Sequence, residues 1–284
     1  MILRVTFDTN VLDYACRPER HPKDPRRPQL SKVHDALSSG AIQGFFSVTI
    51  LTIEGIMEMD RASVYESTMI TKVRETPKTV KNADLPGEIR SFVGDSDLET
   101  HTITLRVDQP SRQQVPPEVR ARVLAAHKMG MRVLKAVPRI GAYRINDPDG
   151  TFYLDNGEGE ALSLWIDKAQ EVATAIEAKG LGMAQLKKLG LGLAISDPQS
   201  TWFSALTKAK DIHEQRKIER AFAEWADADS IASHIAYGVD VFCSDDVGNS
   251  NATNSILDAE NRAWLTQSYG IQFMTFNDLL IALS

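Results

Sequence analysis

Residues 2–13 read ILRVTFDTNVLD, an apolar run that ends directly in an acid followed by threonine and asparagine. The run from Ile2 to Phe7 is typical of a buried strand, so Asp8 stands at the carboxyl end of that strand. Ligands of α/β proteins bind outside the carboxyl ends of parallel strands. An aspartate after a strand is also a common helix N-cap or turn residue. The stretch therefore predicts an α/β fold with Asp8 either in a ligand site or at a helix start.

Strand and helix patterns alternate at both ends of the chain. Residues 43–48, 239–243 and 271–274 are further strand candidates, and helical patterns separate them. Glu54 lies on the helical pattern after the second strand. Alternation of strands with helices predicts parallel strands joined by right-handed crossovers. We therefore expect an α/β core formed by residues 1–60 and 217–284.

The middle of the chain, residues 61–216, has a different character and is predicted to be a mostly helical insertion. Pro117 and Gly130 frame one helix, and Gly159 and Gly180 frame a longer one. Residues 102–107 alternate like a strand, and the glycines within residues 181–195 favour a loop or hairpin. The insertion could be a substrate-selecting cap, a partner-docking surface or an elaborated helical layer.

The composition excludes several classes of protein. The chain has 284 residues, 43% hydrophobic and 25% charged, which is ordinary for a globular protein. Cys16 and Cys243 lie far apart and match neither a disulfide framework nor a zinc site. The absence of a signal sequence and of an apolar run of roughly 20 residues predicts a cytoplasmic protein without a membrane partner.

The net charge of −6 is unusual for a nucleic-acid binder, because such proteins generally carry a surplus of lysine and arginine. A site built from several carboxylates lowers the net charge, however, and attracts phosphate once a divalent cation is bound. The charge is therefore compatible with a metal-dependent enzyme that acts on phosphate esters.

Acidic residues are predicted at the ends of several core elements: Asp8, Glu54, Asp229 and Asp246. Carboxylates that converge repel one another unless a cation lies between them. Oxygen ligands suit one or two Mg²⁺ or Mn²⁺ ions. Such ions activate water for phosphodiester hydrolysis. Asn10 and Ser244 are candidates for orienting a carboxylate or the scissile phosphate through hydrogen bonds.

Three choices between neighbouring acids stay open: Asp245 or Asp246, Asp227 or Asp229, and Glu54 or Glu58. We prefer Asp229 because its helix leads directly into the strand that precedes Asp246. Glu58 lies one helical turn beyond Glu54 and would share its face.

Basic and aromatic residues have both functional and structural interpretations. A proline-rich basic loop follows the first strand and is either a solvated loop or a rim that guides phosphate: Arg17, Arg20, Lys23, Arg26 and Arg27. Basic residues between 120 and 139 have the same two interpretations. The histidines, including His234, show no metal-binding spacing and are expected at the surface or hydrogen-bonded in the core. The aromatic residues at 202, 203, 222 and 225 are expected to pack a core rather than to stack bases.

Several of these segments together resemble the PIN-domain nucleases: DTNVLD at 8–13, the strand and TIE at 45–54, DSIASHIA at 229–236, the strand and SDD at 239–246, and the closing strand and helix from 269. The resemblance implies a three-layer α/β/α sandwich on a parallel sheet, and a divalent-metal-dependent endonuclease that cuts single-stranded RNA. It assigns the four acids to Asp8, Glu54, Asp229 and Asp246, with Ser244, Asn10 and Asp245 in support.

Other functions share parts of this pattern. A phosphatase of the haloacid dehalogenase type also begins with a strand and an aspartate, but it needs a second aspartate where this chain has Asn10. A non-catalytic module that binds RNA or protein, and a DNA-directed nuclease, are further alternatives. RNA is the expected partner, and a homo-oligomer or a protein inhibitor, as in toxin and antitoxin pairs, is compatible with the resemblance. Metal-dependent turnover separates an enzyme from a binding module.

Overall fold

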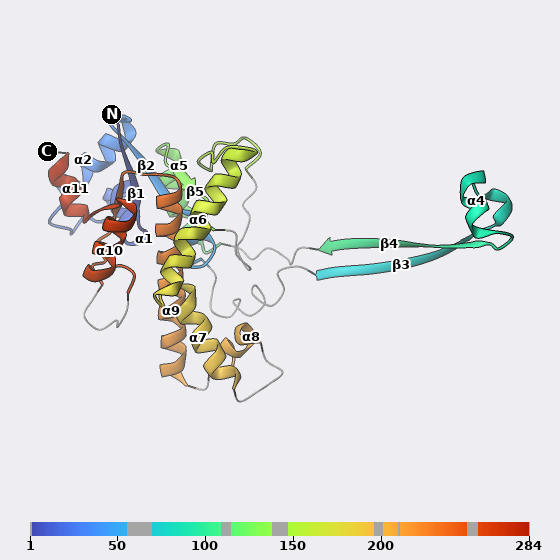
Figure 1. The fold of residues 1–284 in the computed structure, drawn as a ribbon. Helices are drawn as coiled ribbons and strands as arrows, with labels where there is room; N and C mark the ends of the chain where they lie inside the picture. The colour runs from blue at the N-terminus through green and yellow to red at the C-terminus, as the bar shows by residue number, and fades with distance from the viewer. Residues whose placement is uncertain are drawn as a thin grey trace.

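The computed structural model describes residues 2–55, 70–108, 115–137, 147–195, 201–209, 211–248 and 255–283. Figure 1 shows the chain as an α/β body from which a long hairpin extends. The strands are β1 (Leu3–Phe7), β2 (Ile42–Ser47), β3 (Ile70–Val80), β4 (Leu98–Asp108), β5 (Arg132–Leu134), β6 (Val241–Cys243) and β7 (Gln272–Met274). The α-helices are α1 (Thr9–Cys16), α2 (Arg27–Ser38), α4 (Gly87–Val93), α5 (Pro117–Lys128), α6 (Glu160–Ala178), α7 (Met183–Ala194), α8 (Trp202–Leu206), α9 (Ile212–Ala236), α10 (Ala259–Tyr269) and α11 (Phe276–Ala282). Short 3₁₀ helices span Pro18–Arg20, Val48–Leu51 and Asn82–Asp84.

A five-stranded sheet in the order β5-β2-β1-β6-β7 forms the centre of the body. Every pairing in it is parallel, with Thr6 of β1 opposite Phe45 of β2 and Phe242 of β6. The expectation of an α/β protein on a parallel sheet is therefore confirmed, and helices flank the sheet. Because β1 is the central strand, its carboxyl end lies between those of β2 and β6.

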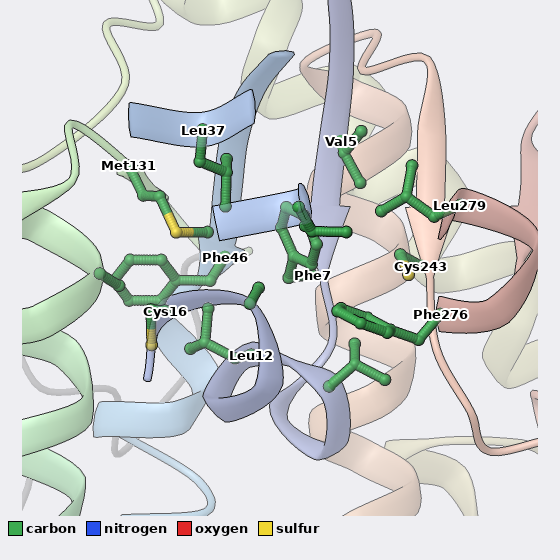
Figure 2. Close-up of a cluster of buried hydrophobic side chains, with 14 of the residues drawn as sticks. Val5, Phe7, Leu12, Cys16, Leu37, Phe46, Met131, Cys243, Phe276 and Leu279 are labelled. Atoms are coloured by element: carbon green, nitrogen blue, oxygen red, sulfur yellow. The ribbon is translucent and has the colours of Figure 1, made fainter. Parts of the chain in front are cut away.

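The two faces of the sheet bury different side chains, as the alternation of a strand requires. Val5 and Phe7 of β1 and Cys243 of β6 point to one face, where they pack against α1, α2 and α11. Figure 2 shows this cluster, with Leu12 and Phe276 among the side chains that close over the sheet. The apolar stripe of the residues after Asp8 is thus explained by the burial of α1 against β1.

The opposite face packs against α6, α9 and α10. Phe242 of β6 contacts this second cluster, which includes Ile231 of α9 and Leu265 of α10. Thr6 also points to this side, and its hydroxyl lies 2.8 Å from Nδ1 of the buried His234. His234 is therefore a hydrogen-bonded core residue, as expected from its isolated position in the sequence.

The core sheet is not confined to residues 1–60 and 217–284. The edge strand β5 lies within the predicted insertion and pairs with β2, with Val133 opposite Phe46. Helix α5 packs through Val123 and Ala126 against the cluster beneath α1. The segment 115–137 therefore belongs to the α/β body. A three-residue strand is too short to show a period of its own, which is why the sequence pattern missed it.

The predicted insertion also contains more strand than expected. Strands β3 and β4 form an antiparallel hairpin in which Ile70 pairs with Asp108 and Val80 with Leu98. The strand predicted at residues 102–107 is confirmed as part of β4. Figure 1 shows this hairpin extending away from the body, with α4 at its far end. We call residues 70–108 the arm.

Helices α7 and α8 and the first half of α9 pack around a third apolar cluster. We call these three helical segments the lobe. Its buried side chains include Leu186, Phe222 and Trp225. The loop or hairpin predicted at residues 181–195 is wrong, because this segment forms α7. Gly190 does not break the helix. A Cβ atom there would collide with the carbonyl oxygen of Trp202, so glycine allows α7 and α8 to approach closely.

The starts of two helices are defined by their local sequence. Helix α2 begins at Arg27, so part of the predicted basic loop is helical. The cap of α11 is Thr275, since the Thr275 hydroxyl accepts from the amide of Asp278 and the Asp278 carboxylate accepts from the amide of Thr275. Among the described residues, no helix is both long enough and apolar enough to cross a membrane.

Candidate functional site

Asp8 lies where the central strand ends and α1 begins, so both interpretations of its position hold at once. It is the N-cap of α1, and its Oδ1 accepts a hydrogen bond of 2.7 Å from the amide of Thr9. Its amide donates to the carbonyl of Cys243 on the neighbouring strand β6. Only 7% of Asp8 is exposed. Burial raises the pKa of this carboxyl, whereas the hydrogen bonds from Ser244 and Thr9 lower it.

Ser244 and Asn10 hold the second oxygen of Asp8. The Ser244 hydroxyl donates to Oδ2 over 2.6 Å, and Asn10 Nδ2 donates to the same oxygen over 2.9 Å. Asn10 also joins the two sides of the site, because its Nδ2 lies 3.0 Å from the Ser244 hydroxyl and its Oδ1 accepts from the amide of Asp245. These contacts are those expected of residues that orient a carboxylate.

Glu54 lies close to Asp8 but in a turn after the 3₁₀ helix that ends at Leu51, not on the helix that the sequence pattern suggested. Its Oε1 accepts from the hydroxyl of Thr9 over 3.0 Å and from that of Thr49 over 3.5 Å. As a whole residue Glu54 is exposed. Even so, the surrounding protein and the nearby Asp8 raise its pKa to about 7. Glu58 lies outside the described residues.

Asp227 of α9 lies within electrostatic range of Asp8, Glu54 and Asp246. Burial raises the pKa of Asp227 well above its ordinary value, and repulsion from Asp8, Glu54, Glu224 and Asp246 raises it further. Residues two apart on an α-helix project about 200° apart, so only one of the two aspartates can face this group.

Asp229 is a buried residue of α9 beside Trp225. It is 1% exposed, and its Oδ2 accepts from the indole of Trp225, one turn earlier on α9. Asp227 is therefore the stronger candidate for the third acid of the site. The spacing along the helix indicates the different surroundings of the two aspartates. Asp229 shares its face with the buried Trp225, whereas Asp227 follows Glu224 by three residues.

Asp245 and Asp246 have different surroundings. Asp245 Oδ1 accepts from the amide of Phe276 at the start of α11, and its Oδ2 lies 3.4 Å from Arg26. Asp246 is exposed, and its negative charge contributes to the raised pKa of both Asp8 and Asp227. Asp246 is thus the one that faces the other acids, while Asp245 anchors the neighbouring helix.

Two arginines lie near the acids. Arg262 of α10 donates to the carbonyl of Asp246, and its positive charge lowers the pKa of Asp8. Arg122 of α5 lies 3.5 Å from Asp13, and its charge lowers the pKa of Glu54. Arg262 was not predicted, since neither its helix nor its spacing marks it in the sequence.

The basic residues after β1 are largely engaged within the protein. Arg17 pairs with Asp13 and Glu118, and Arg20 with Glu118. Arg26 pairs with Asp24 and Asp245. Lys23 and Arg27 have exposed side chains. Of the five candidates for phosphate binding, Arg20, Lys23 and Arg27 are exposed.

The acidic side chains are farther apart than the ligands of a closed metal site. Within the described residues, no three histidine, cysteine or acidic side chains lie close enough together to hold a metal ion as they stand. The chemistry of the donor set nevertheless fits a hard cation, because four carboxylates from separate elements repel one another, and a divalent ion would relieve that repulsion. These residues are Asp8, Glu54, Asp227 and Asp246.

Comparisons of the chain with models of protein families, with curated proteins and with solved structures found no match. The arrangement itself is a group of acids and two arginines at the carboxyl end of a parallel sheet. Such a group can bind a cation, orient a phosphate and accept a proton.

Proposed function

We propose that this protein is a divalent-metal-dependent endoribonuclease that hydrolyses phosphodiester bonds of single-stranded RNA, built on a three-layer α/β/α sandwich of the PIN type. The observation that carries the proposal is the place of Asp8 at the carboxyl end of the central strand, held by Asn10 and Ser244 and within electrostatic range of Glu54, Asp227 and Asp246. The resemblance of the flanking motifs supports the family, and the arm and lobe are additions to that fold.

The carboxylates of these residues would hold one or two Mg²⁺ or Mn²⁺ ions, which when bound supply an activated water and a counter-charge for the phosphate. Asn10 and Ser244 keep Asp8 in one orientation through their hydrogen bonds to Oδ2. Thr9 does the same for Glu54. Pre-oriented ligands reduce the rearrangement needed at the moment of reaction.

Arg262 supports a phosphate substrate over a purely structural role for the site. Its guanidinium lies close enough to lower the pKa of Asp8 while it also donates to the backbone of Asp246. A fixed arginine at the edge of an acidic site stabilises charge on a phosphate oxygen. Asn10 supports a nuclease over a phosphatase of the haloacid dehalogenase type, because it donates to Asp8 and has no acidic group to act as a general acid.

The test is cleavage of labelled single-stranded RNA and of DNA with the same sequence, in the presence of Mn²⁺, Mg²⁺ or a chelator. We expect RNA cleavage that the chelator abolishes and that Asp8→Asn, Asp227→Asn and Asp246→Asn reduce by roughly 100-fold or more. Glu219→Gln, an exposed change of charge on the same helix as Asp227, is the matched control and should keep full activity.

Asp229→Asn separates the two candidate assignments of the third acid. If its activity stays near that of the wild type while Asp227→Asn is inactive, the third acid is Asp227. Circular dichroism of every variant checks that the fold is retained. RNA binding without cleavage under all metal conditions would instead support the binding module. Cleavage of DNA alone would identify DNA, and not RNA, as the substrate.

A further inference from the structure

The end of the arm carries an exposed acidic and apolar surface. Glu88, Ile89 and Phe92 of α4 are spaced by three and four residues, so they share one helical face. All of them are exposed, and Phe92 is 90% exposed. We call these three residues the tip. Around it, Lys81 and Arg90 are outnumbered by Asp84, Glu88, Asp95 and Asp97, which gives residues 81–97 a formal charge of −2.

The described side chains of the arm lie mostly in solvent. Two strands of 11 residues each extend for about 35 Å. Most described residues of the ribbon, at 75–79 and 101–103, are exposed. A two-stranded ribbon with both faces in solvent is only marginally stable. A large exposed aromatic residue at its end is typical of a surface that is covered by a partner.

The lobe carries a surface of the opposite charge. Lys187, Lys188 and Leu191 of α7, with Ile195 directly after it, recur at spacings of three and four residues and form one stripe. All four are exposed, and Ile195 is 84% exposed. Residues 183–195 contain two lysines and no acid. We call these four residues the basic stripe.

From this complementarity we propose that the protein is a homodimer in which the tip of each arm docks on the basic stripe of the other copy. Glu88 would face the lysines, while Ile89 and Phe92 would cover Leu191 and Ile195. In Figure 1 the arm carries α4 away from the body and from α7, which favours a contact between copies over one within a chain. The exchange is reciprocal and closes with twofold symmetry.

RNA is the less favourable occupant of the tip, because a surface with a formal charge of −2 repels phosphate. The basic stripe alone would accept RNA, but a second copy of the chain accounts for the tip and the stripe together. The proposal does not depend on the nuclease activity, and its test has a separate readout.

The experiment is sedimentation velocity over a wide range of concentration, with Phe92→Ser at the tip and Ile195→Ser in the stripe. The wild type should form a species of twice the 31.5 kDa chain mass, and each variant should weaken its formation by roughly tenfold or more. Ile281→Ser removes a comparably exposed apolar residue, 67% exposed, from α11 and should leave the dimer intact. Since all three side chains are exposed, the fold should be retained, which circular dichroism checks.

Mixing the two variants makes the test specific for exchange. A mixed dimer keeps one unaltered contact, formed by the arm of the Ile195→Ser copy and the lobe of the Phe92→Ser copy. The mixture should therefore dimerise more strongly than either variant alone. A monomeric wild type, a dimer that only one variant weakens, or a mixture no stronger than its components would each overturn the proposal.

Discussion

The buried His234 makes a quantitative prediction about stability and pH. Burial lowers its pKa from the ordinary 6.5 to about 3, with a smaller contribution from the positive charge of Arg4. One ring nitrogen lies beside the Thr6 hydroxyl, the other has no hydrogen-bond partner among the described residues, and the ring packs edge-on against Phe242. Nothing described around the ring stabilises a positive charge.

Proton binding at His234 determines whether the protein gains or loses stability in acid. Between pH 6.5 and pH 3 the unfolded chain binds a proton at His234 that the folded chain does not, so stability falls as the pH falls through this window. Each pH unit within it costs about 1.4 kcal/mol. Lowering the pH from 7 to 5 should therefore remove about 2 kcal/mol of folding free energy through this residue alone.

The assay compares urea unfolding of the wild type with that of His234→Asn at a series of pH values. The variant loses stability at pH 7 because it leaves a cavity, and that cost does not depend on pH. Other titrating groups act on both proteins and cancel in the difference. The gap between the two proteins should narrow by about 2 kcal/mol between pH 7 and pH 5. Two curves that stay parallel would refute the assignment of a buried, neutral imidazole.

Three further predictions concern packing, capping and charge. Gly190→Ala should destabilise the lobe by about 1–3 kcal/mol in thermal unfolding, because its Cβ would meet the backbone of Trp202, whereas Gly192→Ala, with open space around it, should be neutral or stabilising. Thr275→Ala should lower the free energy of unfolding in urea by about 1 kcal/mol because it removes the cap of α11, whereas Thr275→Ser should keep most of the stability that the cap provides. Asp227→Asn should stabilise the fold while it removes activity; since the pKa of this acid is raised, the gain should be largest above neutral pH and shrink in acid.

Local sequence signals predicted the parts of the structure that depend on local chemistry. An apolar run before Asp8 predicted the central strand and the place of the acid, because parallel strands bring their carboxyl ends to one edge. Asn10 and Ser244 were expected to orient a carboxylate, and both donate to Asp8. These predictions needed only strand ends and side-chain type.

Features that depend on distant partners were not predictable in the same way. Gly190 reads as a helix breaker until its contact with Trp202 is known. The choice between Asp227 and Asp229 depended on the phase of a 25-residue helix, most of whose faces are buried by elements far away in the chain. Arg262 reaches the site because α10 packs beside β6, and no local sequence pattern predicts that contact.

The pairing of β1 with β6 has a consequence for synthesis on the ribosome. Asp8 and Ser244, which share a hydrogen bond, are 236 positions apart in the chain. At translation rates of about 5–20 residues per second, roughly 10–50 seconds separate the emergence of the first acid from that of its partner. During this time β1 can pair with β2 but not with β6. Asp8 and Glu54 have emerged, whereas Asp246 has not yet been synthesised. A nascent or prematurely terminated chain therefore lacks the contact between Ser244 and Asp8, and the candidate site is complete only once the final two strands have been made.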